Sequence, residues 1–158
     1  MKKLFEFILN LFKRKNKSVI RYEFPIYTIK DSDISLFNEI NQHRLSLGLN
    51  TLNYGFDESL DIVGDHAKFL SDRVSNKEDF KKIGHWYVNH RFQQIQLRDK
   101  NIKYLGECLS YGYVNPKSVV FSWVKSEGHR EILEGDFTHV AIGSDKKINV
   151  VIFYRDGN

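Results

Sequence analysis

Gly106-Glu107-Cys108-Leu109 and, further on, Trp123-Val-Lys-Ser-Glu-Gly-His129-Arg130 are the stretches that decide the fold. The alternating, aromatic-rich run from Glu107 to Tyr113 predicts a strand. Asn115-Pro116 predicts the start of a helix, because Asn is a good N-cap and Pro suits the first helical position. That helix would bury Trp123 and end at Gly128, which leaves a turn at Gly-His-Arg. With His85 earlier in the chain, these stretches predict a cavity formed by His85, Glu107 and His129.

The remaining segments divide into helices first and a strand pair last. Apolar residues recur at helical spacing in two regions and more weakly in a third, whereas residues 75–86 are polar and typical of a loop. The predicted helices cover 31–47, starting at a cap on Asp31 or Asp33, then 57–74 and 88–97, and the predicted hairpin strands cover 138–144 and 148–154. This order favours an α+β domain with an antiparallel sheet.

The composition is that of one folded domain. A chain of 158 residues with 41% hydrophobic and 14% aromatic residues can bury a substantial core. Cys108 is the only cysteine, so no disulfide within the chain can hold the fold.

The positive charge is concentrated at the N-terminal end. Residues 1–21 contain seven Lys and Arg against Glu6 alone, a net of +6, and since the whole chain carries +4, residues 22–158 carry −2. The folded part therefore lacks the basic surface that nucleic-acid binding requires, and we expect no nucleic-acid partner.

Residues 1–17 have the pattern of an amphipathic helix that is too short to span a bilayer, which takes about 20 residues. Such a helix can lie on an anionic membrane surface, or it can pack on its own domain or on a partner in an assembly. Glu6 and Asn10 interrupt the apolar run and no small-residue cleavage site follows, so there is no clear cleavable signal peptide. We expect residues 18–30 to be a linker or an added edge strand, and residues 31–155 to be the domain.

The ordered motifs resemble those of the CAP superfamily, the cysteine-rich secretory, antigen 5 and pathogenesis-related class 1 proteins, also called SCP-like domains. The likeness covers about residues 34 to 154 and is closest to the short bacterial members that lack disulfides. It rests on Asn41-x-His43-Arg44, Gly84-His85, Arg91, Gly106-Glu107, Trp123-x-x-Ser126, Gly128-His129-Arg130 and Val140-Ala141-Ile142-Gly143.

This resemblance implies a three-layer α-β-α sandwich with a central antiparallel sheet. It also implies a cavity in which His85, Glu107 and His129 match the family's two histidines and one of its two acidic residues. Ser126 stands where the second acidic residue would be, and Cys108 replaces the usual Asn. The family resemblance favours a cell-surface, membrane-associated or secreted protein.

Two functions fit these residues. The first is a module that binds a ligand, lipid or protein in a His/Glu/His cleft, with Ser126, Trp86 and Tyr87 lining it. The second is a metal-assisted hydrolase, similar to a peptidase, in which His85 and His129 hold zinc or another divalent metal and Glu107 acts as base. Glu107 could instead orient a histidine ring, and the cavity could be purely structural. Cys108 should face away from Glu107 as a buried apolar residue.

Overall fold

The computed structural model describes residues 26–157. The amphipathic helix predicted for residues 1–17 therefore lies outside the described residues, as does the linker up to residue 25. The helices of the described part are α2 (Asp31–Ser46), α3 (Asp57–Ser75), α4 (Phe80–Ile83), α5 (Val88–Arg98), α6 (Pro116–Val124) and α7 (Glu127–Leu133). None of these helices is long and apolar enough to cross a membrane.

The sheet has four strands in the order β1-β3-β4-β2: β1 (Asn53–Tyr54), β2 (Ile102–Tyr111), β3 (His139–Asp145) and β4 (Ile148–Asp156). The pairs β2–β4 and β3–β4 are antiparallel, but β1 runs parallel to β3. The sheet is therefore mixed, which corrects the expectation of a wholly antiparallel sheet. The two residues of β1 are too few to give a periodic signal in the sequence.

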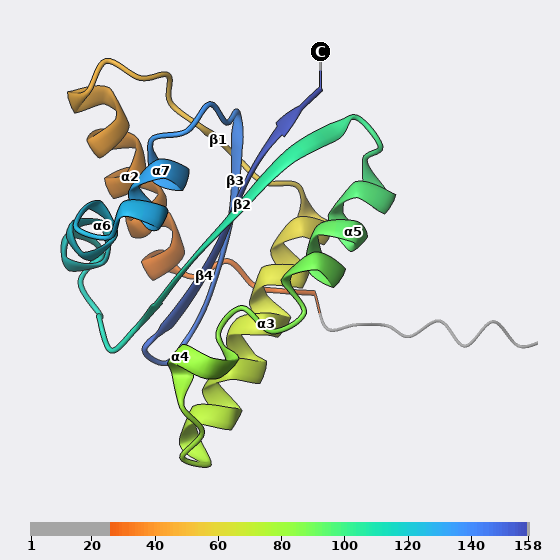
Figure 1. The fold of residues 1–158 in the computed structure, drawn as a ribbon, viewed down its shortest axis with the longest axis vertical. Coiled ribbons are helices and arrows are strands. Elements are labelled where there is room, and N and C mark those ends of the chain that lie inside the picture. Colours follow the sequence, from red (N-terminus) through yellow and green to blue (C-terminus); the bar gives the residue numbers. More distant parts are fainter. Residues whose placement is uncertain (1–25, 158) are drawn as a thin grey trace, which may run out of the picture.

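Helices cover both faces of this sheet (Figure 1): α2, α6 and α7 lie on one side, and α3, α4 and α5 on the other. Each face has its own buried cluster. Ile40, Trp123 and Phe153 belong to the cluster under α2 and α6, whereas Leu70 and Ile95 belong to the cluster under α3 and α5. Strand β2, which carries the Gly106-Glu107 motif, forms one edge of the sheet between these two helical layers.

Helix α6 begins as predicted, because the Asn115 side chain accepts a hydrogen bond from the Lys117 N–H at 2.9 Å and Pro116 takes the first helical position. The predicted end at Gly128 is wrong. Helix α6 stops at Val124, and Gly128 lies inside α7, where the Arg130 N–H already bonds to the Ser126 carbonyl at 2.8 Å. Packing of Leu133 into the core outweighs the low helix propensity of one glycine.

Two glycines let α3 approach the sheet. A Cβ atom on Gly143 of β3 would lie 2.5 Å from the backbone nitrogen of Gly64 in α3, closer than real Cβ atoms come. Helix and strand therefore touch backbone to backbone at this crossing. A Cβ on Gly64 would collide with the ring of Tyr27, so this ring packs directly on the helix backbone.

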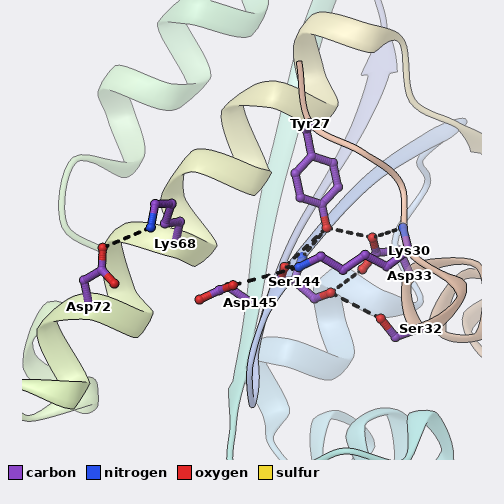
Figure 2. Close-up of polar contacts among 8 residues, drawn as sticks. All are labelled: Tyr27, Lys30, Ser32, Asp33, Lys68, Asp72, Ser144 and Asp145. Atoms are coloured by element: carbon purple, nitrogen blue, oxygen red, sulfur yellow. Dashed lines mark hydrogen bonds and ion pairs between the residues drawn. The ribbon is translucent and has the colours of Figure 1, made fainter. Parts of the chain in front are cut away.

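The first described residues are fastened by a buried polar network (Figure 2). The Tyr27 hydroxyl donates to Asp33 Oδ2 at 2.7 Å and accepts from the Ser144 N–H at 2.8 Å, while Ser144 Oγ donates to Asp33 Oδ1. Asp33 is completely buried and is the third residue of α2, not its cap; its carboxylate accepts the Lys30 N–H at 2.9 Å. Residues 26–30 form no strand.

Candidate functional site

Glu107 is the buried centre of the predicted site. It lies on β2, and only 2% of its side chain is exposed. Arg91 of α5 holds the carboxylate at two points, since Nε donates to Oε2 at 2.8 Å and Nη2 donates to Oε1 at 2.7 Å. His85 Nδ1 lies 2.8 Å from the same Oε1. Both carboxylate oxygens are therefore engaged by neighbouring side chains.

His85 lies in the turn between α4 and α5, and its position is fixed from two sides. His66 of α3 is buried, and its Nε2 donates to the carbonyl of Gly84 at 2.7 Å. Burial lowers the pKa of His66 to about 4, so this histidine is neutral at pH 7. Because a carboxylate can only accept, His85 Nδ1 carries a hydrogen toward Glu107, which leaves Nε2 as the nitrogen available to another partner. The His85 side chain is 53% exposed.

His129 lies on α7, in the helical layer on the opposite face of the sheet from α5. Its Nδ1 lies 2.9 Å from the hydroxyl of Ser126, the residue immediately before the helix. The ring of Trp123 lies tilted beside it, with 6.5 Å between ring centroids. Like His85, His129 is held through Nδ1, and Nε2 makes no hydrogen bond within the described part of the chain.

Electrostatics relate the two histidines across the edge strand. Burial lowers the pKa of His129, and the charge of His85 lowers it further. The direct contacts join His85 to Glu107 and His129 to Ser126, and no hydrogen bond joins one pair to the other among residues 26–157.

The remaining predicted residues divide into two cases. Cys108 is fully buried on the face opposite Glu107, its Sγ donates to the His129 carbonyl at 3.7 Å, and burial raises the pKa of its thiol. It is packing, not a nucleophile, as its place in the strand predicted. Trp86 and Tyr87 follow His85 and are 42% and 71% exposed. Tyr87 adopts a left-handed backbone conformation, with φ of 60°, that non-glycine residues rarely take.

The amino-acid sequence of this chain was compared with known protein families and proteins. No protein-family model matches the chain. It is 31% identical over 78 residues to the uncharacterized membrane protein YlbC of Bacillus subtilis, a match that covers 46% of this chain and 22% of YlbC. It is 32% identical over 104 residues to the uncharacterized protein YkwD of the same organism, which covers 65% of this chain and 38% of YkwD. The chain thus matches well under half the length of either relative.

Similarity to solved structures covers more of this chain than similarity to the sequence relatives does. The chain is similar to an extracellular protein containing a SCP domain from Bacillus anthracis, with a TM-score of 0.64, 23% identity and coverage of 79% of this chain and 40% of that one. A cysteine-rich secretory protein from Staphylococcus aureus gives a TM-score of 0.60, 16% identity, and 79% and 39% coverage. This chain has the CAP fold.

An outer surface protein from Borrelia burgdorferi is a further match, with a TM-score of 0.56, 22% identity, and coverage of 84% of this chain and 98% of that one. Two of these three structural neighbours are therefore described as extracellular or outer-surface proteins. At these identities the comparison supports the CAP fold and leaves the chemistry of the site to the residues themselves.

The donor set of this chain fits a resident zinc ion poorly. Zinc in proteins is held by three or four protein ligands. Glu107 is taken up by Arg91 and His85, which leaves the Nε2 atoms of His85 and His129 as the available donors. Within residues 26–157, no group of three or more His, Cys, Asp or Glu side chains is arranged to hold a metal.

Arg91 is the site residue whose role sequence reasoning missed. The buried residues of α5 are Arg91 and Ile95, and Phe92 is partly buried against the same core cluster. Arg91 and Ile95 lie four positions apart and so share one helix face. A cation on that apolar face was the available signal, because a buried guanidinium requires a carboxylate partner.

Proposed function

We propose that this CAP domain is a binding module whose ligand contacts His85 and His129 in a shared cleft at the β2 edge of the sheet. The supporting observation is that the Glu107 carboxylate is buried and hydrogen-bonded by its neighbours. A general base must reach the proton that it takes, either directly or through one water. Here both oxygens accept hydrogen bonds from Arg91 and His85, and the carboxylate is 2% exposed. Glu107 therefore serves as an anchor that orients His85.

The two histidines suit recognition. Each ring is oriented through Nδ1 and keeps Nε2 for an external partner, either as an acceptor when neutral or as a donor when protonated. Ser126 fixes the ring of His129, and the exposed Trp86 and Tyr87 beside His85 add aromatic surface at the rim. A ligand, lipid or protein that offers polar groups next to an apolar surface would use both features.

We also propose that the chain acts at a cell surface or outside the cell. This rests on the extracellular and outer-surface descriptions of its structural neighbours and on the description of YlbC as a membrane protein. Residues 1–17 would provide the contact with a membrane surface or an assembly.

Binding can be tested by NMR, with a defined panel of extended peptides, lipid headgroups and soluble sugars as probes. We expect saturable shifts of the amides of residues 85–87 and 126–129 for at least one probe class, without product formation. The shifts should disappear in the His85→Asn/His129→Asn double variant and persist in the exposed control variant His90→Asn.

The metal-assisted hydrolase is the second function, favoured by the two Nε2 atoms that His85 and His129 leave available. It requires turnover that is lost in Glu107→Gln while the bound metal is retained. Zinc stoichiometry after purification without chelators tests its premise. Less than about a tenth of an equivalent would count against a metal site of the usual protein type.

A further inference from the structure

A cavity of about 650 Å³ lies between α3 and α5; His66, Tyr87 and Arg91 line it and also border the His85 site, but His85, Glu107 and His129 do not line it. Glu58, Asp61 and Asp65 line its α3 side. Phe69 of α3 and Leu97 of α5 contribute apolar surface, and Leu97 is 74% exposed. The cavity thus combines carboxylates with exposed apolar groups, which suits an amphipathic cationic occupant.

The charge on the opposite wall does not cancel these carboxylates. Arg91, His90 and Arg98 line the α5 side, but the guanidinium of Arg91 is already paired with Glu107. Among the arginines that line the cavity, Arg98 is therefore the one left to balance the charge of the three carboxylates. Burial raises the pKa of Asp65, and the nearby Asp61 raises it further, so additional positive charge at this wall would be stabilising.

The described chain starts beside this acidic wall. The backbone N–H of Tyr27 donates to Asp61 Oδ1 at 2.5 Å, and the Tyr27 ring covers Gly64 of the same helix. The described part of the chain thus begins next to the cavity. The tether of residues 18–25 can reach at most about 26–29 Å, which exceeds the dimensions of a cavity between two neighbouring helices.

We propose that the cavity between α3 and α5 is the docking site of the chain's own residues 1–17. This segment contains six Lys and Arg against Glu6, together with Leu and Phe residues at helical spacing. Its cations complement the α3 carboxylates, and its apolar residues match Phe69 and Leu97. A short tether gives such a segment an effective concentration in the millimolar range, so weak contacts suffice for docking. The proposal goes beyond the proposed binding function and does not depend on it.

Docking would compete with membrane contact, because one apolar face cannot cover the cavity and enter a lipid surface at the same time. The segment would then be released onto an anionic membrane only where lipid contacts exceed those with the cavity.

Cross-linking in the full-length chain tests the proposal. Two double variants, Asn10→Cys/Leu97→Cys and Asn10→Cys/Val114→Cys, are treated with a short bismaleimide at low protein concentration. Leu97 and Val114 are matched in exposure, at 74% and 75%, and Val114 lies outside the cavity. Cys108 is buried with a raised thiol pKa and does not interfere. We expect an intramolecular yield at least about fivefold higher for the Leu97 pair, given the difference in effective concentration.

Charge reversal provides the second readout. Adding Glu58→Lys and Asp65→Lys to the Leu97 pair should lower its yield to the level of the Val114 pair, whereas Asp72→Lys, on α3 but outside the cavity, should not. Equal yields for the two pairs would overturn the proposal. So would cross-links that form only between molecules, which indicate a second copy as occupant, or a Leu97 yield above the control only when anionic vesicles are present.

Discussion

At the scale of single residues, the contact of Arg91 with Glu107 determines what the carboxylate can do in the site. Its guanidinium is 6% exposed and binds both oxygens of Glu107, which in turn receives His85. This chain of contacts makes the carboxylate part of the framework of the site. Removing one partner of a buried ion pair costs more than the pair contributes, because the remaining charge stays buried without compensation.

Glu107→Gln should therefore lower the free energy of unfolding by about 3–5 kcal/mol, measured by urea denaturation at pH 7. Glu58→Gln, at an exposed carboxylate on α3, should change it by about 0.5 kcal/mol or less. A loss below about 1 kcal/mol for Glu107→Gln would mean that water reaches Arg91 and that the pair is not buried in solution.

His66 makes stability depend on pH. Its pKa is about 4 in the folded chain and near 6.5 when unfolded, so the unfolded chain binds more protons between these values. Stability then rises with pH in this window and is lost as pH falls through it. We expect a loss of about 2–3 kcal/mol between pH 7 and pH 4.5.

The matched variant for this effect is His66→Gln, which keeps a donor for the Gly84 carbonyl. Urea unfolding at both pH values should show a smaller pH dependence in the variant than in the unsubstituted chain. An identical dependence would assign the titration to other groups.

At the scale of elements, the crossing of α3 and β3 holds one helical layer against the sheet. Gly143 permits backbone contact with Gly64, and no side chain fits between them. Since α3 carries His66, this crossing also fixes the height of the Gly84–His85 turn above the sheet.

Gly143→Ala should therefore destabilise the fold by about 2–3 kcal/mol, because its methyl group would push α3 away from the sheet. Gly128→Ala is the control, since a Cβ there meets nothing within 4 Å. Alanine in helix α7 should be neutral or stabilising by up to about 1 kcal/mol. Thermal unfolding of the two variants measures the difference, and equal midpoints would contradict the close approach.

Sequence patterns located the helices and strands that are long enough to show a periodic pattern or that have a clear capping residue. Helices α2, α3 and α6 and strands β3 and β4 lie where periodicity, Asn115 and the hairpin turn predicted them. The four residues of α4 and the two of β1 are too short for a periodic signal. Helix α7 replaces a predicted turn, because Gly128 looks like a stop signal and tertiary packing of Leu133 is not visible in sequence.

At the scale of the whole molecule, the proposed cleft requires the two helical layers to bring His85 and His129 to one sheet edge. The sequence resemblance pointed to His85, Glu107 and His129, and the fold is the one found in solved SCP-domain structures. Contact between His85 and Glu107 follows from that fold, but the pairing of Glu107 with Arg91 could not be deduced from spacing. It depends on how α5 packs on the sheet, where Ile95 is buried in the core, and no local motif encodes that packing.

The central claim is that His85 and His129 share one cleft, and the pKa of His129 tests it most directly. The charge of His85 lowers that pKa across the edge of the sheet. Imidazole NMR titration of the His85→Asn variant should therefore give a higher pKa for His129 than in the unsubstituted chain, with His90→Asn as the control that leaves it unchanged. A His129 pKa that does not move when His85 is replaced would place the two rings in separate environments and contradict the account.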